Sequence, residues 1–195
     1  NTMFPDFSWA CSDIKKIKDE YKLDRYIVLF PFCSPQLSQK KWSYYNELIN
    51  LIKNNPDSRR MVVTAWNPSV LDEIALPSCH AFFIFNVING KLNCHLTQRS
   101  GDIALGIPFN LACYATLTQM IAQETNLELG EFSHYINDAH IYVDHIEGLK
   151  IQLKRSPLKL SKLVISKKSF WHLKFEDFAL INYKHHPVIK FPVAV

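Results

Sequence analysis

The chain has 195 residues, of which 48% are hydrophobic, 13% aromatic and only 21% charged. A chain of this composition can bury a substantial core, which excludes disorder as its main state. Its net charge of +4 is spread along the sequence, so it suits an anionic small molecule better than DNA, whose binding proteins usually carry a clustered basic face.

Neither a membrane span nor a disulfide framework is expected. The longest apolar stretches, 27–33 and 81–87, have the length of strands and fall short of the roughly 18–20 residues that a membrane helix needs. The first residues also lack the pattern of a signal peptide. The five cysteines, whose number is odd, show no CxxC spacing, which predicts free thiols in a reducing cytoplasm and no metal site.

The predicted elements of the first half begin with a helix over 12–22 and a short strand over 26–30. A second helix is predicted over 42–54, because Tyr45, Leu48, Ile49 and Ile52 recur on one helical face and Pro56 cannot continue it. Strands are predicted over 61–66, 80–88 and 91–98. The last two are joined at Asn89-Gly90, which is typical of a tight hairpin turn.

The second half is predicted to contain a buried helix over 111–124 and an extended segment over 132–142. Residues 145–155 fit a helix or a strand equally well, and the tail alternates strand-like pieces with prolines. The order of elements shows no regular βαβ alternation and no GxGxxG or GxxxxGK[ST] loop. We therefore expect a single α+β domain over 1–195 with a mixed β-sheet and packed helices.

Three groups of residues could carry chemistry. Cys79 precedes one hairpin strand and Arg99-Ser100 follows the other, so an arginine that can hold a phosphate should lie near a thiol whose thiolate it would favour. Taken alone, Cys79 is more often a buried small residue, and Arg99 more often a member of a surface ion pair.

The other two groups are also ambiguous from their residues alone. Arg59 and Arg60 form either a solvated corner or an anion site, in this subunit or across a dimer. In a strand, Asp138, His140 and Tyr142 would share one face, which suits either hydrogen bonds to a sugar or a place in the core.

The chain from about Asn55 to Val195 resembles the thymidylate synthase family. No single motif is specific, but their order and spacing together are. The motifs are Ser58-Arg59-Arg60, Ala65-Trp66-Asn67-Pro68, Cys79-His80, Gly90-Lys91-Leu92, Gln98-Arg99-Ser100, Asp102, Leu105-Gly106, Pro108-Phe109-Asn110, Gly130-Glu131-Phe132, Asp138-Ala139-His140-Ile141-Tyr142, Phe175-Glu176-Asp177-Phe178 and Pro192-Val193-Ala194-Val195.

The resemblance implies reductive methylation of dUMP to dTMP with 5,10-methylenetetrahydrofolate as co-substrate. Cys79 would be the nucleophile that adds to C6 of uracil, and Asn110 would read the uracil edge. The remaining implied roles divide among the substrates. Gln98, Arg99, Ser100 and Asp102, with Arg59 and Arg60 from the neighbouring subunit of a homodimer, would bind the nucleotide; His140 and Tyr142 would hold its sugar; and Asp102, Leu105, Gly106, Phe109 and Ala194 would contact the folate.

Residues 1–54 depart from the family pattern and are expected to be a divergent or truncated N-terminal part. The Arg-containing RTGTGT phosphate loop and the Glu-Leu-Leu-Trp-like motif with the catalytic glutamate are not found in them, although Trp9 and Tyr26 stand near expected family positions. Smaller departures within the matching part are Ser78, Thr97, Ala104 and Asn137, which replace proline, tyrosine, an aromatic residue and glycine.

Two alternatives stay open. One is a pyrimidine-nucleotide hydroxymethyltransferase of the same superfamily, in which water replaces hydride; Asn110 favours a uracil base over cytosine. The other is a non-catalytic dimeric relative that binds nucleotide weakly, which the two motifs not found in 1–54 favour.

Overall fold

The structure is a computed structural model that describes residues 44–73 and 77–193. The helix predicted over 12–22 and the strand predicted over 26–30 lie outside these residues. The elements follow one another as α2 (Tyr45–Asn54), β1 (Val62–Thr64), η2 (Pro68–Glu73), β2 (His80–Ile88), β3 (Lys91–Asp102), α3 (Gly106–Thr125), β4 (Glu128–His140), η3 (Val143–His145), α4 (Ile146–Leu153), β5 (Lys162–Ile165), η4 (Phe170–His172), η5 (Phe175–Asp177) and β6 (Phe178–Ile181).

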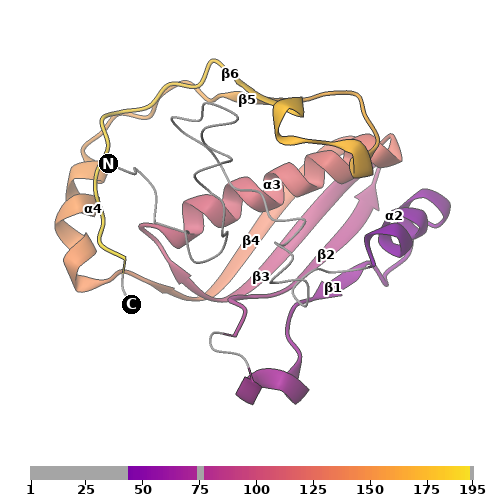
Figure 1. Cartoon of the computed structure of the whole chain (residues 1–195), viewed down its shortest axis with the longest axis horizontal. Helices are drawn as coiled ribbons and strands as arrows, with labels where there is room; N and C mark the ends of the chain where they lie inside the picture. Colours follow the sequence, from indigo (N-terminus) through magenta and orange to yellow (C-terminus); the bar gives the residue numbers. More distant parts are fainter. Residues whose placement is uncertain (1–43, 74–76, 194–195) are drawn as a thin grey trace.

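A four-stranded sheet in the order β1-β2-β3-β4 forms the centre of the fold, with α3 lying across one of its faces (Figure 1). β1, β2 and β3 pair antiparallel, whereas β3 and β4 pair parallel. The predicted mixed sheet and α+β class are therefore confirmed. The parallel pair requires a crossover, which α3 provides.

The β2–β3 hairpin turns at Asn89-Gly90, as predicted. Both residues have positive φ, 52° at Asn89 and 73° at Gly90, which is the requirement of a type I′ turn. The turn sets the register from the Ile88–Lys91 pair to the Phe82–Thr97 pair, and a β-bulge between His80 and Phe82 then shifts it so that His80 lies opposite Gln98 at the far end of the hairpin. The turn and the bulge together set which residues of the two strands meet at the candidate site.

β3 is longer than predicted: it continues past Gln98 to Asp102. The extension is stabilised by β4, since Ser100 pairs with Asp138 and Asp102 with His140. This pairing is remote in sequence, so the apolar pattern of β3 alone could not reveal it. It brings two predicted groups of site residues, on β3 and β4, to one edge of the sheet.

α3 begins at Gly106 rather than at the predicted residue 111. Pro108 falls in its first turn, where a proline is tolerated because the backbone N–H groups there have no partner within the helix. The earlier start places Asn110 on the first turns of the helix, where its side chain bonds to Gln98 of β3 and His80 of β2. The helix ends at Asn126, whose left-handed φ of 56° caps it.

The core lies between α3, the sheet and α2. On α2 the four predicted residues, Tyr45, Leu48, Ile49 and Ile52, are the buried ones, which confirms the helical face. From the sheet, Phe83, Phe85, Leu92 and Leu96 point into the same core, and α3 adds Tyr114, Met120 and Ile121.

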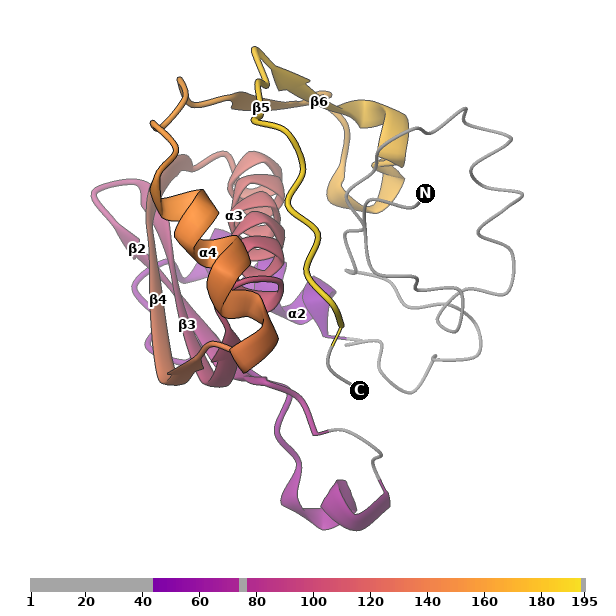
Figure 2. The same cartoon turned by 90° about the vertical axis from the view of Figure 1, so that its left-hand side faces the viewer.

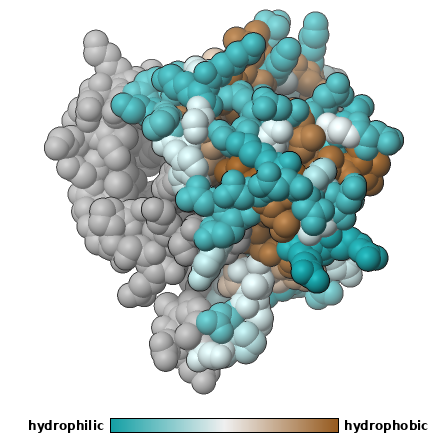
Figure 3. All heavy atoms as spheres, turned by 90° about the vertical axis from the view of Figure 1, so that its right-hand side faces the viewer, coloured by the Kyte–Doolittle hydropathy of each residue, from teal (hydrophilic) through white to brown (hydrophobic). Residues whose placement is uncertain are grey.

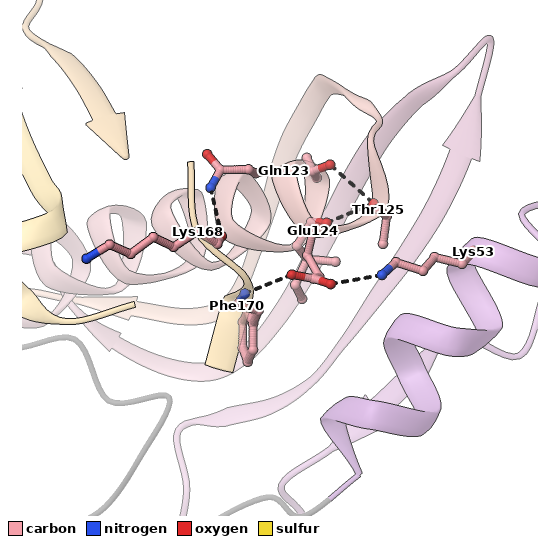
Figure 4. A network of polar contacts seen from close by, with 8 residues as sticks. Lys53, Gln123, Glu124, Thr125, Lys168 and Phe170 are labelled. Carbon is pink, nitrogen blue, oxygen red and sulfur yellow. Dashed lines mark hydrogen bonds and ion pairs between the residues drawn. The ribbon is translucent and has the colours of Figure 1, made fainter. Parts of the chain in front are cut away.

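Glu124 near the end of α3 connects three segments (Figure 4). One carboxylate oxygen lies 2.8 Å from Lys53 Nζ on α2, and the other accepts a hydrogen bond of 2.8 Å from the backbone N–H of Phe170. The lysine bond lowers the pKa of Glu124 below its ordinary value. The same helix end therefore fixes both α2 and the segment that follows β5.

The segment 145–155, which fitted a helix or a strand, forms α4, while β5 and β6 pair antiparallel. After β6 the chain returns along α4 (Figure 2). Arg155 Nη2 donates to Pro187 O at 2.6 Å. Gly148 leaves room for the returning segment, because a Cβ at this position would overlap the ring of Phe191.

Apolar side chains also reach the surface, among polar ones, on the face that carries α2 (Figure 3). Among the helices of the described residues, including the 20 residues of α3, none combines the length and the apolar character needed to cross a bilayer.

Candidate functional site

Cys79 lies in the loop that enters β2, and Arg99 on β3 fastens this loop. The backbone N–H of Arg99 donates to Cys79 O at 2.9 Å. Its guanidinium donates to Ser78 O at 3.1 Å and to Pro77 O at 2.7 Å, and lies 5.8 Å from the ring centre of Trp66. The hairpin thus places a permanent positive charge beside the cysteine loop, as the sequence predicted.

The described cysteines differ in their surroundings. Cys79 is half-buried, whereas Cys94 on β3 is fully buried. Burial raises the pKa of Cys94 from 9.0 to about 11 and also raises the pKa of Cys113 on α3. Because the thiolate is the reactive form, these shifts disfavour Cys94 and Cys113 as reactive thiols.

A chain of polar side chains starts directly after Cys79. His80 Nε2 lies 2.7 Å from Asn110 Nδ2, and Asn110 Oδ1 accepts from Gln98 Nε2 at 3.0 Å. Gln98 Nε2 also donates to Ser100 O at 2.8 Å, and Gln98 Oε1 lies 2.9 Å from His134 Nε2. Three strands and α3 therefore contribute to one network.

The network has a defined direction. Ser100 O can only accept, so it fixes the nitrogen side of the Gln98 amide, and Gln98 in turn requires an oxygen from Asn110. Asn110 must then donate to His80 Nε2, which therefore carries no proton. The proton of His80 resides on Nδ1, 3.2 Å from the hydroxyl of Tyr114. The chain of bonds thus orients the amide of Asn110.

The charge state of His80 agrees with this direction. Its pKa is lowered from 6.5, first by burial and second by the nearby His134. The imidazole is therefore neutral at pH 7, as its bond from Asn110 requires.

The parallel pairing of β3 and β4 brings together Ser100 and His140, whose Oγ and Nδ1 lie 3.5 Å apart. Asp138 flanks the histidine, with its backbone oxygen 3.2 Å from Nδ1. Tyr142 lies beyond the end of β4, not on the strand as predicted. Its ring nevertheless contacts that of His140 edge to face, with centroids 5.2 Å apart.

The residues predicted to contact folate gather where β3 passes into α3. Asp102 is the last residue of β3, Leu105 caps α3, and Gly106 and Phe109 lie in its first turns. The carboxylate of Asp102 accepts a bond of 2.9 Å from the N–H of Ala104. A Cβ at Gly106 would be in ordinary contact with Asp102 at 3.7 Å, so packing within the chain does not require this glycine.

Arg59 and Arg60 are not brought to Cys79 within this chain. Both are exposed, and Arg59 lines a pocket together with residues 84–87, toward the other end of β2. Their distance from the cysteine follows from the antiparallel pairing of β1 with β2, in which Val62 faces Ile84.

Asn137, which stands where the family usually has glycine, does not need left-handed backbone. It lies within β4, and the described non-glycine residues with positive φ are Asn89, Asn126 and Asn182. The conformational reason for a glycine at this position therefore does not apply here. Trp9, Tyr26 and Ala194 lie outside the described residues.

Sequence reasoning gave no role to His80, Tyr114 or His134, which complete the network around Asn110. His80 could have been suspected because it follows Cys79 directly. No sequence pattern marks Tyr114 or His134 as a site residue, since each reaches the site only through the packing of α3 and β4 on β3. Within the described residues, no group of three or more His, Cys, Asp or Glu side chains could hold a metal ion.

Comparison with known proteins gives consistent results. A family model described as thymidylate synthase matches residues 13–195, and so starts upstream of Asn55, where the sequence motifs begin. Thymidylate synthases of Mycoplasma mobile and Mycoplasma pneumoniae are 51% and 49% identical over 164 and 163 residues. Each alignment covers 80% of this chain and 57% of the relative.

Among solved structures, thermostable thymidylate synthase A from Bacillus subtilis matches with a TM-score of 0.74 and 43% identity. The match covers 77% of this chain and 55% of that one. The chain therefore spans a little over half the length of the relatives it matches.

Proposed function

The chain belongs to the thymidylate synthase family, and from this membership we propose that it catalyses the reductive methylation of dUMP to dTMP with 5,10-methylenetetrahydrofolate. The observation that carries the proposal is the placement of Cys79 between two groups suited to this chemistry. Arg99 holds the cysteine loop from one side, and the next residue, His80, holds the amide of Asn110.

Cys79 is the proposed nucleophile. Its thiolate forms a bond to C6 of uracil, which makes C5 nucleophilic, and C5 then attacks the one-carbon unit of the folate. The C5 proton is then lost and tetrahydrofolate departs, which leaves an exocyclic methylene group at C5 of the enzyme-bound ring. Hydride transfer from tetrahydrofolate to this carbon expels the Cys79 thiolate from C6 and yields dTMP and dihydrofolate. The guanidinium of Arg99 supplies positive charge that favours the thiolate and attracts the nucleotide phosphate, with Ser100 as a neighbouring hydroxyl donor.

Asn110 is the proposed reader of the uracil ring. Its bonds to Gln98 and His80 leave one lone pair on Oδ1 and one hydrogen on Nδ2. These match the N3–H donor and the O4 acceptor of uracil. Gln98 is only 2% exposed and its amide is engaged inside the protein, so its part in substrate binding is to hold Asn110.

His140 and Tyr142 are proposed to bind the deoxyribose, which the exposed edge formed by their two rings supports. The turn from Asp102 through Leu105, Gly106 and Phe109 is proposed to receive the folate, with Ala194 closing over it. The room at Gly106 supports this role, since among the described residues the nearest side-chain atoms to a Cβ there would be those of Asp102 and Asn110, at 3.7 and 3.8 Å.

A homodimer is proposed as the assembly. α3 covers one face of the sheet (Figure 2), while the strand register puts Val62, Ile84 and Tyr135 on the opposite face in adjoining rows. A second copy packed on that face would shield these side chains and bring Arg59 and Arg60 toward the neighbouring site. A reducing cytoplasm is the expected setting, in keeping with the free thiols.

The names of the relatives favour this function over hydroxymethylation. The alternative of a non-catalytic role is supported by the sequence of residues 1–54, in which the phosphate loop and the glutamate motif are not found. The two functions differ in whether the site completes covalent chemistry on Cys79, which one experiment can decide.

The test is incubation with 5-fluoro-dUMP and methylenetetrahydrofolate followed by intact-protein mass spectrometry. Fluorine at C5 cannot leave as a proton does, so an adduct of protein, nucleotide and folate is expected to accumulate. Cys79→Ser should abolish the adduct, and Cys113→Ser, at a thiol whose pKa burial raises, should retain it. A folded protein that binds dUMP but never forms the adduct would be non-catalytic.

A further inference from the structure

His145, at the end of η3, is 0% exposed and belongs to no motif used above. Its Nε2 lies 2.7 Å from the backbone oxygen of Pro192, in the segment that returns along α4. A carbonyl oxygen can only accept, so Nε2 carries a proton and donates it. This bond fixes the C-terminal segment at a point three residues before the chain ends.

The second nitrogen of His145 faces the folate side of the site. Nδ1 lies 3.6 Å from Oδ1 of Asp102, just beyond hydrogen-bond length, and no described group forms a hydrogen bond with it. The other carboxylate near the ring is that of Asp144, 3.9 Å from Nε2. A fully buried ring with one unsatisfied nitrogen is unusual, which suggests a role beyond packing.

Aromatic packing holds the ring in this position. Tyr142 lies on one side with centroids 5.4 Å apart, and Phe191 on the other at 5.2 Å, both edge to face. Gly148 on α4 allows this arrangement, since a Cβ there would approach Ile189 at 3.1 Å and overlap Phe191. The imidazole of His145 thus contacts the C-terminal segment and Tyr142, which is proposed to bind the sugar, and it faces Asp102.

We propose that His145 is a positioning residue that couples the seating of the C-terminal segment to the carboxylate of Asp102. Its bond to Pro192 sets where the segment lies, and its Nδ1 side sets the position of Asp102. The identity of the ligand as a folate rests on the proposed function. The coupling itself is a property of the unliganded chain.

Three substitutions separate the two sides of the ring. His145→Gln keeps an N–H donor near the position of Nε2, His145→Asn keeps one near Nδ1 only, and His145→Phe keeps the aromatic volume with neither. The first measurement is amide hydrogen exchange of a peptide covering 186–195 in the full chain. We expect about tenfold faster exchange in His145→Phe and His145→Asn, and only about threefold faster exchange in His145→Gln, which keeps the donor to Pro192 but loses the Nδ1 side.

The second measurement is calorimetric binding of dUMP, then of tetrahydrofolate at saturating dUMP. The affinity for tetrahydrofolate should fall across the three variants in the same order as the protection of the 186–195 amides from exchange. The affinity for dUMP should change by less than about twofold in each of them. Equal exchange in all three variants would reduce His145 to a packing residue, and unchanged exchange in His145→Phe would also overturn the proposal. If amide exchange of the 186–195 peptide follows the prediction but the native chain does not bind tetrahydrofolate, the proposed function is rejected and the coupling through His145 stands.

Two further variants keep the test decisive if His145→Phe does not fold. Gly148→Ala should speed amide exchange of the 186–195 peptide with the imidazole intact, because its methyl group displaces Phe191. Asp102→Asn should speed it about threefold when His145 is present and have no effect beside His145→Gln, which lacks a group on the Nδ1 side. An equal effect of Asp102→Asn in both backgrounds would show that the coupling does not pass through His145.

Discussion

Asn110 shows how a single side chain can acquire specificity from its neighbours. An isolated asparagine can rotate its amide to suit either uracil or cytosine. Here Ser100 O orients Gln98, Gln98 orients Asn110, and the unprotonated Nε2 of His80 accepts from the other side. Reversing the amide would break two hydrogen bonds in a partly buried site, which costs roughly 1–3 kcal/mol per unsatisfied group.

We therefore expect calorimetric titration to show dUMP binding at least about tenfold tighter than dCMP. Asn110→Asp should narrow or reverse this preference, because a carboxylate accepts from the 4-amino group of cytosine. Gln98→Leu should narrow it as well, by freeing the amide to rotate. Equal affinities for the two nucleotides in the unchanged protein would remove Asn110 from this role.

His80 leads to a prediction about pH. Its pKa is lowered from 6.5 in the folded chain by burial and by His134, so the unfolded chain takes up a proton first as the pH falls. Stability from this group is therefore complete above pH 6.5. It is lost as the pH falls from 6.5 to the lowered pKa, by at most about 1.4 kcal/mol per pH unit for one proton.

The measurement is urea unfolding between pH 5 and 8 for the native chain and for His80→Asn, which has no proton to gain. The difference in unfolding free energy between the two should shrink below pH 6.5. A difference that stays constant, or that grows on acidification, would show that His80 is not held neutral by the fold.

Among the elements, β4 depends on one glycine where it meets β3. A Cβ at Gly130 would overlap the side-chain amide of Asn93 and approach the backbone oxygen of Leu92 at 2.9 Å. Asn93 cannot simply move away, because its Oδ1 accepts a bond of 2.7 Å from Glu131 N. The register shift between Leu92 and Cys94 lies at the same place, so backbone and side chain are both constrained.

Gly130→Ala should consequently destabilise the chain by roughly 1–3 kcal/mol, the usual range for overpacking. Gly106→Ala is the matched control, since its nearest contacts would be ordinary ones at 3.7 and 3.8 Å. Thermal unfolding monitored by circular dichroism distinguishes the two. Equal stability of Gly130→Ala and Gly106→Ala would mean that the β3–β4 junction adapts more easily than its contacts indicate.

At the scale of the whole molecule, the sheet face opposite α3, which no described helix covers, determines the expected assembly. Tyr135 is 63% exposed there and pairs across the strands with Thr97. Light scattering at micromolar concentration should give the mass of a dimer. Tyr135→Asp should shift the mass toward that of a monomer, because a carboxylate would be buried at the interface without a partner.

Tyr183→Asp, at an exposed residue after β6, is the control and should remain dimeric. A folded monomer formed by the unchanged chain would contradict the proposed dimer, and with it the transfer of Arg59 and Arg60 to a neighbouring site.

The sequence alone determined the features that depend on local chemistry. The apolar face of α2, the Asn89-Gly90 turn and the β2–β3 hairpin each follow from residues close together in the chain. The hairpin in turn predicted that Arg99 lies beside the Cys79 loop, and the motifs identified the family. These predictions held because turn conformations and helical periodicity are set by neighbouring residues.

The tertiary structure decided what depends on contacts between distant segments. The extension of β3 to Asp102 needs β4, and the directed network around Asn110 needs His134 from β4 and Tyr114 from α3. The burial of His145 between Asp102 and Pro192 needs the chain to return along α4. No local pattern encodes these contacts, because they arise from packing among elements whose register and direction are fixed only when the whole fold forms.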